Sequence, residues 1–232
     1  MSVHVAVLAS GGGSNLQAIL DYLDALAPRA GVSVALVASD RVAAGALDRA
    51  RARGIAAVHL DADRRGDAMA ELLRSQAIDV IALAGYLRFV PVGVTRQWRG
   101  RILNVHPSLL PAFGGAGMYG LRVHQAVLDA GVRITGATVH FVDEEYDRGP
   151  IIAQWPVPVL PHDTAETLAR RVLAVEHALF PRIVHDVCEG RITLGADGRV
   201  AGVAESLPEC VTFALSNGQP KVTDIFSNER SP

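Results

Sequence analysis

The sequence predicts an α/β fold with a mostly parallel sheet and helices on both of its faces, from three observations. Short apolar runs typical of buried strands alternate with segments whose apolar residues recur at helical spacing. A glycine-rich turn, residues 10–15, lies between the first such strand and the first helix. Residues 134–141 alternate in character, which indicates a strand with two distinct faces and an antiparallel partner.

Composition limits the class of protein. The chain has 232 residues, half of them apolar and a fifth charged, with a net charge of -2. This predicts a globular protein with a sizeable core, and it lacks the basic footprint of a nucleic-acid binder. No apolar run is long enough for a membrane span, and Val3–Ala9 is too short for a signal peptide. Two cysteines, Cys188 and Cys210, without metal spacing fit a reducing cytoplasm, and we assign them no role.

The elements follow in order along the chain. Apolar runs predict strands over 3–10, 33–39, 55–60, 80–84, 102–106, 134–141 and 151–155. Helical spacing predicts helices from residue 14 and over 44–53, 67–76, 123–129 and 164–180, with Pro181 as an interruption before helix resumes over 183–188. The pattern weakens after Gly190. We therefore expect one catalytic domain over 1–190 and a partly irregular or flexible extension over 191–232.

The glycine-rich turn is a candidate anion site. Ser14 with Gln17 resembles a capping box, which places the glycines directly before a helix N-terminus, where free amides favour an anion. No Lys-Ser/Thr pair follows, so the turn is not a P-loop. Leu16 replaces the third glycine of a dinucleotide fingerprint. A phosphate monoester is the favoured ligand, with a dinucleotide or a plain tight turn as alternatives.

Asn104 and His106 stand out at the end of a predicted strand. Residues two apart in a strand point to the same face, so both side chains project together. Pro107 and Pro111 stiffen the chain that follows. An amide can donate to a developing oxyanion and an imidazole can move a proton, which suits chemistry on a carbonyl. The alternative is a strand that ends in an ordinary turn.

Three further segments carry candidate residues. Leu87, Phe89 and Val90 follow a predicted strand and could form an apolar slot for a flat ring, although ordinary core is the commoner role. Asp147 stands beside the rigid Gly149-Pro150 turn, where a carboxylate can orient an imidazole. For His140, on an alternating strand, a hydrogen bond to nearby backbone is the commoner role.

Together these segments resemble the folate-dependent phosphoribosylglycinamide formyltransferases. The match is ordered, runs from Val3 to about Cys188, and is most specific in the Asn-x-His-Pro-Ser-Leu-Leu-Pro stretch. The matching segments are Ser-Gly-Gly-Gly-Ser-Asn (10–15), Leu-Ala-Gly-Tyr-Leu-Arg (83–88), Asn-Val-His-Pro-Ser-Leu-Leu-Pro (104–111), Gly-Ala-Thr-Val-His-Phe-Val (136–142) and Asp-Arg-Gly-Pro-Ile (147–151). One departure is the glycine-rich stretch 113–122, where many relatives have a shorter Pro-Gly loop.

The resemblance implies a Rossmann-like mixed sheet and a role for each matching residue. Asn104, His106 and Asp147 fall on the family's catalytic triad. The positions implied for the ribonucleotide are Gly12, Gly13, Ser14, Asn15 and Glu176. The positions implied for the folate are Arg65, Leu87, Arg88, Phe89, Val90, Asn104, Asp143, Glu144, Glu145, Tyr146 and Asp147.

The implied reaction moves a formyl group from 10-formyltetrahydrofolate, a co-substrate, to the amine of 5'-phosphoribosylglycinamide in purine (IMP) biosynthesis. The resemblance implies protonated His106 as the group that stabilises the oxyanion and passes a proton to the folate nitrogen, and it implies no metal. Formyltetrahydrofolate deformylase, or another formyltransferase that uses the same folate, is the alternative. We expect a cytoplasmic monomer or homodimer without nucleic-acid or membrane partners.

Overall fold

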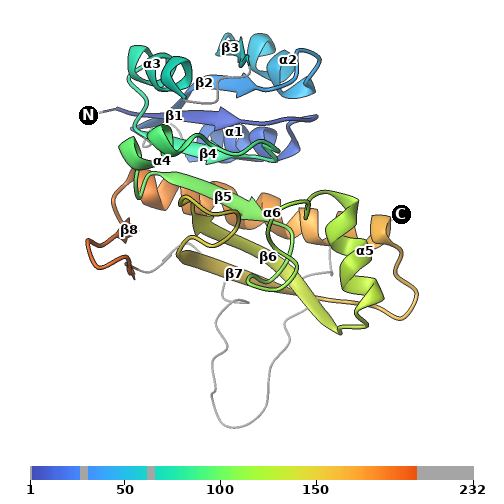
Figure 1. Cartoon of the computed structure of the whole chain (residues 1–232). Coiled ribbons are helices and arrows are strands. Elements are labelled where there is room, and N and C mark those ends of the chain that lie inside the picture. Colours follow the sequence, from blue (N-terminus) through green and yellow to red (C-terminus); the bar gives the residue numbers. More distant parts are fainter. Residues whose placement is uncertain (1, 27–30, 62–65, 203–232) are drawn as a thin grey trace.

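A computed structural model describes residues 2–26, 31–61 and 66–202 (Figure 1). Seven strands form one sheet in the order β3-β2-β1-β4-β5-β6-β7. The strands are β1 (Val3–Leu8), β2 (Val32–Ser39), β3 (Ala56–His59), β4 (Val80–Leu83), β5 (Ile102–His106), β6 (Ile134–Phe141) and β7 (Ile151–Pro158). The first five pair in parallel, whereas β6 runs antiparallel to both β5 and β7. This confirms the mostly parallel, mixed sheet.

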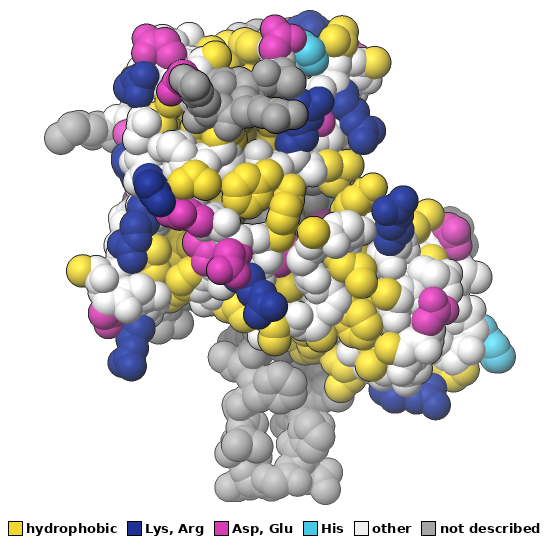
Figure 2. Space-filling model, in the orientation of Figure 1, with side chains coloured by type: hydrophobic (Ala, Val, Ile, Leu, Met, Phe, Trp, Pro, Cys, Tyr) yellow, Lys and Arg dark blue, Asp and Glu magenta, His cyan; other side chains and the backbone are white. Residues whose placement is uncertain are grey.

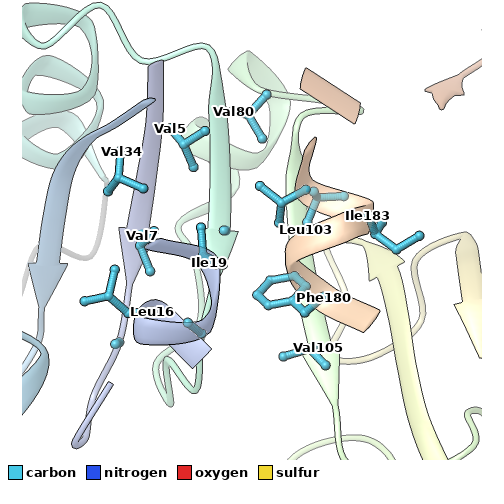
Figure 3. Close-up of a cluster of buried hydrophobic side chains, with 14 of the residues drawn as sticks. Val5, Val7, Leu16, Ile19, Val34, Val80, Leu103, Val105, Phe180 and Ile183 are labelled. Carbon is cyan, nitrogen blue, oxygen red and sulfur yellow. The ribbon is translucent and has the colours of Figure 1, made fainter. Parts of the chain in front are cut away.

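Helices cover both faces of the sheet. They are α1 (Ser14–Leu26), α2 (Gly45–Ala52), α3 (Asp67–Ser75), α4 (Val92–Gln97), α5 (Leu121–Asp129) and α6 (Ala165–Cys188). Side chains from α1, α2 and α6 pack on one face of the strands, as Figure 3 shows for Leu16, Ile19, Phe180 and Ile183. Side chains from α3 and α4 pack on the opposite face.

Strand alternation explains why both faces are apolar. On β1, Val5 and Val7 contribute to the core beneath α1 and α6, whereas Ala6 and Leu8 contribute to the core beneath α3 and α4. All four side chains are at most 1 % exposed. A strand buried on both faces is therefore apolar throughout, and this is the pattern from which the sequence predicted a parallel sheet.

Two local predictions were wrong. Pro181 does not interrupt the last helix, because α6 is continuous from Ala165 to Cys188. A proline removes one helical hydrogen bond, but Phe180 and Ile183 on either side are fully buried, and this packing holds the helix together. Ser14 and Gln17 form no capping box, since Ser14 is already the first helical residue. The Gln17 side chain bonds Asp21 and Arg49 instead.

Two short elements were not predicted. Helix α4 follows the loop after β4, and Trp98 at its end is buried, with its indole nitrogen donating to the carbonyl of Ile78. Strands β8 (Thr193–Leu194) and β9 (Val200–Ala201) form a small antiparallel pair. Ile192, just before β8, is 2 % exposed and belongs to the core beneath α6. A domain boundary at residue 190 stays a prediction, and Cys210 lies outside the described residues.

The described part of the chain contains no helix that is both long and apolar enough to cross a bilayer.

Candidate active site

A cavity of about 450 Å³ opens at the carboxyl ends of β4 and β5, between the parallel strands and helix α5. In Figure 2 the surface is hollowed between the upper part of the molecule and the part that carries α5, and hydrophobic side chains lie at the margin. Among the candidate residues, the cavity lining includes Asn15, Leu87, Arg88, Phe89, Val90, Asn104, His106, Asp143, Glu145, Tyr146, Asp147 and Glu176. Its size suits a drug-sized organic ligand.

Strand β5 delivers Asn104 and His106 to this cavity from the same face, as predicted. His106 is 3 % exposed and Asn104 is partly buried. Pro107 ends the ladder, so the two side chains are the last polar groups of the strand before the loop.

Asp147 meets both of these side chains although it lies 41 residues beyond His106 in the sequence. Its Oδ2 is 3.5 Å from His106 Nδ1, and its Oδ1 accepts from Asn104 Nδ2 at 3.3 Å. The backbone φ of Asp147 is +54°, a left-handed conformation that aspartate tolerates better than most residues. Burial raises the pKa of the Asp147 carboxyl, but His140 and His106 when they are protonated, together with the Gly115 amide, outweigh burial and lower that pKa below its usual value.

His106 is hydrogen bonded through its other ring nitrogen. Nε2 donates to the carbonyl of Phe113 at 2.8 Å. Burial lowers the pKa of His106, against the opposing effects of Asp147 and the Phe113 carbonyl. The resemblance implied a protonated imidazole; in this arrangement the neutral form is favoured, because burial outweighs the carboxylate.

His140 is the residue whose role the sequence underestimated. It was expected to bond nearby backbone, and its Nδ1 does donate to the carbonyl of Phe141 at 2.8 Å. Its Nε2, however, lies 3.1 Å from Asn104 Nδ2 and 3.7 Å from Asp147. In the neutral ring Nδ1 carries the hydrogen, so Nε2 accepts from the Asn104 amide and fixes its orientation. The cross-strand pair Asn104–His140 in β5–β6 creates this contact, and only the register reveals it.

The glycine-rich loop after β5 lies directly on these side chains. Besides the Phe113 carbonyl on His106, the amide of Gly115 donates to Asp147 Oδ2 at 2.8 Å. A Cβ at Gly114 would lie 2.4 Å from Leu110 and 3.2 Å from Asp147, so the chain can approach this closely only with glycine there. The glycine-rich stretch 113–122 therefore forms part of the site.

His124 is a second residue that sequence reasoning missed. It projects from α5 into the cavity and is 4 % exposed. Burial, with a smaller effect from His106, lowers its pKa to about 4, so it is neutral near pH 7. Its Nδ1 is buried without a hydrogen-bond partner among the described residues. A histidine on the apolar face of a short helix gave no signal that distinguished it from a core residue.

The two segments assigned to the folate lie side by side. The rings of Phe89 and Tyr146 meet edge to face with centroids 5.0 Å apart. Glu144 does not line the cavity, because its carboxylate pairs with Arg96 on the surface, which lowers the pKa of Glu144. Arg65 lies outside the described residues.

The glycine-rich turn begins at the carboxyl end of β1 and packs on α2. Gly13 has a φ of +74°, and a Cβ there would lie 2.9 Å from the Cα of Ala46. At Gly12 a Cβ would have no atom within 4 Å, so this residue faces open space. Gly12, Gly13 and Ser14 do not line the cavity, and their contact with a ribonucleotide stays a prediction.

Asn15 and Glu176 connect this turn to the cavity. Asn15 Nδ2 donates to Glu176 Oε2 at 2.7 Å, which joins α1 to α6. Burial raises the pKa of Glu176 to about 7, and the Asn15 hydrogen bond opposes it only in part. The Oδ1 of Asn15 is buried with no hydrogen-bond partner among the described residues.

The described residues contain no group of three His, Cys, Asp or Glu side chains placed to hold a metal ion.

Comparison with known proteins agrees with this fold. Residues 3–184 match the family described as Formyl transferase. The chain belongs to this formyl transferase family.

The relatives are named more narrowly. A chloroplastic phosphoribosylglycinamide formyltransferase of Arabidopsis thaliana is 41 % identical over 201 residues, which cover 84 % of this chain and 68 % of the relative. The phosphoribosylglycinamide formyltransferase of Haemophilus influenzae is 38 % identical, over 82 % of this chain and 89 % of the relative. The chain spans 64 % of a second plant relative and a fifth of trifunctional animal proteins.

Solved structures give the same result. Glycinamide ribonucleotide transformylase 1 from Symbiobacterium toebii superposes with a TM-score of 0.79 at 43 % identity, over 87 % of this chain and 94 % of that one. A formyltetrahydrofolate deformylase from Pseudomonas syringae superposes with a TM-score of 0.77 but is 25 % identical, and this chain covers 66 % of it.

Proposed function

We propose that the chain transfers the formyl group of 10-formyltetrahydrofolate to the amine of 5'-phosphoribosylglycinamide, a step of de novo purine biosynthesis. The observation that carries the proposal is the meeting of Asn104, His106 and Asp147 at one cavity. Relatives at 38 % and 41 % identity over most of the chain bear the name of this activity.

The residues divide the chemistry of formyl transfer. When the amine attacks the formyl carbon, negative charge develops on the formyl oxygen, and a side-chain N–H from Asn104 stabilises it. Both amide hydrogens of Asn104 point to protein acceptors, at 3.1 Å and 3.3 Å, so one of them exchanges its partner for the oxyanion. The Asp147 bond is the longer and the weaker of the two.

His106 moves the proton. In its neutral form Nε2 carries the hydrogen donated to the Phe113 carbonyl, so Nδ1 accepts the proton from the attacking amine. The resulting imidazolium is stabilised by Asp147 beside Nδ1 and by the Phe113 carbonyl. It then returns the proton to the folate nitrogen that leaves. A pKa below its usual value keeps the imidazole ready to accept, while the adjacent carboxylate keeps protonation accessible.

Binding uses two parts of the site. The ribonucleotide phosphate binds the amides of Gly12–Asn15 at the N-terminus of α1, and Glu176 contacts the same substrate. The pterin lies against Leu87–Val90, where apolar side chains face the cavity. Backbone groups of this segment bind the polar edge of the pterin, and Asp143–Asp147 lies on the opposite side of the ring. The sequence resemblance also assigns Arg65, outside the described residues, to the folate.

The remaining proposals concern the localisation, the oligomeric state and an alternative activity. We place the protein in the cytoplasm, as a monomer or homodimer that acts on small molecules without a metal. Formyltetrahydrofolate deformylase activity is the second candidate, because the Pseudomonas syringae deformylase shares the fold at 25 % identity.

One assay separates the candidates. The purified protein is given 10-formyltetrahydrofolate with 5'-phosphoribosylglycinamide, with initiator tRNA, or with no acceptor except water. We expect rapid release of tetrahydrofolate only with the ribonucleotide. Equal release without any acceptor would establish the deformylase, and dependence on tRNA would establish a different formyltransferase.

A further inference from the structure

A chain of hydrogen bonds behind the cavity has no part in the chemistry proposed above. Ser10, just after β1, donates its hydroxyl hydrogen to Asp40 Oδ1 at 2.5 Å and accepts from the backbone N–H of Leu87 at 2.9 Å. The second carboxylate oxygen of Asp40 accepts from Arg88 Nε at 3.2 Å. Ser10 is 2 % exposed and the side chain of Asp40 is 8 % exposed, so water competes little for these bonds.

The segment that these bonds hold has few other attachments. The carbonyl of Gly85 accepts from the backbone N–H of Ser10 at 3.0 Å. Between Tyr86 and Val90, Leu87 has the one backbone N–H that donates to a protein acceptor within residues 2–26, 31–61 and 66–202. The other backbone N–H groups of this segment are thus available to a ligand, and Ser10 provides the one protein acceptor among the described residues that holds its backbone N–H side.

The orientation of the Ser10 hydroxyl depends in turn on Asp40. A serine hydroxyl rotates freely and can donate one hydrogen while it accepts another. Because Asp40 takes the hydroxyl hydrogen, an oxygen lone pair of Ser10 is directed at Leu87. Because Asp40 also bonds Arg88, one carboxylate restrains two consecutive residues of the cavity wall.

We propose that Ser10 and Asp40 are positioning residues for the folate: they hold segment 85–88 so that its backbone meets the polar edge of the pterin. The proposal rests on the proposed function, since it takes Leu87–Val90 as the pterin site. Neither residue lines the cavity, so both act through Leu87 and Arg88.

The test compares Ser10→Ala, Asp40→Ala and Asp40→Asn with a matched control, Asp79→Ala. Asp79 also accepts from a backbone N–H, that of His4 at 2.8 Å, but at the opposite end of β1 and β4. Measured quantities are kcat, the KM of each substrate, the affinity for tetrahydrofolate by calorimetry, and the hydrogen exchange of the Leu87 amide by NMR.

We expect Ser10→Ala and Asp40→Ala to raise the KM of the folate and weaken tetrahydrofolate binding by about tenfold, the scale of one buried hydrogen bond. kcat and the KM of the ribonucleotide should stay within about twofold, because the groups that react are not displaced. The Leu87 amide should exchange faster in both variants. Asp40→Asn keeps an acceptor for Ser10 and should restore most of the affinity, and Asp79→Ala should leave both substrate KM values unchanged.

Unchanged folate affinity in Asp40→Ala, or a Leu87 amide that exchanges as in the wild type, would overturn the proposal. So would a parallel loss of both substrate affinities together with the melting temperature, which indicates a general structural role. If the wild-type protein does not bind tetrahydrofolate, the proposed function itself fails. If the wild type binds it and all variants bind it equally well, only the positioning role fails.

Discussion

The two walls of the cavity are built differently. The parallel half contributes segment 85–90 to the cavity wall, where one backbone N–H is bonded, and places the glycine turn 10–15 beside the cavity, with Asn15 reaching the lining. The wall from β5, β6 and the loop before β7 presents side chains, and Asn104, His140 and Asp147 contact one another across it. Binding therefore belongs mostly to local backbone geometry, whereas the chemistry depends on contacts between distant segments.

The largest effect is expected from a substitution of Asp147, in the wall formed by side chains. Asp147→Asn keeps the size of the residue and suits its left-handed backbone, since asparagine also tolerates positive φ. The imidazolium formed at His106 loses its partner, and turnover should fall by about 10²- to 10⁴-fold, the scale of general acid–base groups. Steady-state kinetics beside a thermal melt measure both outcomes.

Asp163→Asn is the matched control for this change. Asp163 is also a shielded carboxylate, 3 % exposed at its side chain, but it pairs with Arg171 at the start of α6, away from the cavity. It should lose stability and keep its turnover. A stable Asp147→Asn protein with wild-type kcat would show that Asp147 only caps its turn.

A smaller effect is expected at His140, within the same wall. His140→Phe removes the acceptor at 3.1 Å from Asn104 Nδ2 and frees the amide to rotate. An unsatisfied buried group costs about 1–3 kcal/mol, so kcat should fall by about tenfold to a hundredfold. Both KM values should change little, because neither binding segment contains His140. Wild-type kcat in a folded His140→Phe protein would exclude an orienting role.

The glycine turn beside the cavity is tested at Gly12. Gly12→Ala places a methyl group where no protein atom lies within 4 Å, so the fold should tolerate it while a bound phosphate does not. We expect the KM of the ribonucleotide to rise by about tenfold, the equivalent of one lost anion contact, with the KM of the folate unchanged. Gly13→Val would test this poorly, since its side chain would collide with Ala46. An unchanged ribonucleotide KM in Gly12→Ala would move the phosphate elsewhere.

The smallest expected effect is on the pH dependence of stability, at Glu176, which bonds Asn15 beside the cavity. Burial raises its pKa to about 7 from an ordinary 4.5, so the folded protein holds a proton that the unfolded chain releases between these values. Wild-type stability should therefore fall as pH rises from about 4.5 to 7, and the loss is complete above pH 7. Glu176→Gln lacks this titration and should melt a few degrees higher than wild type at pH 8.

Thermal melts of both proteins without ligands, at pH 5 and pH 8, measure this difference. Glu71→Gln, the same substitution at an exposed carboxylate, is the matched control. A constant difference between Glu176→Gln and wild type at the two pH values would contradict the raised pKa.

The sequence by itself determined the parallel sheet, the glycine turn and the shared face of Asn104 and His106. Each follows from a local rule: apolar runs, missing side chains, or the two-residue period of a strand. The local rules were least reliable at Pro181 and at Ser14, where burial and the turn of Gly13 outweighed the intrinsic preference of the residue.

Only the tertiary structure decided which side chains contact one another. The antiparallel register of β5 and β6 places His140 opposite Asn104, and the loop after β6 brings Asp147 to His106. Register and loop path depend on the packing of the whole sheet, so no short stretch of sequence encodes them. The pKa values of His106, His124 and Glu176 were equally out of reach, because the burial that shifts them comes from elements distant in the chain.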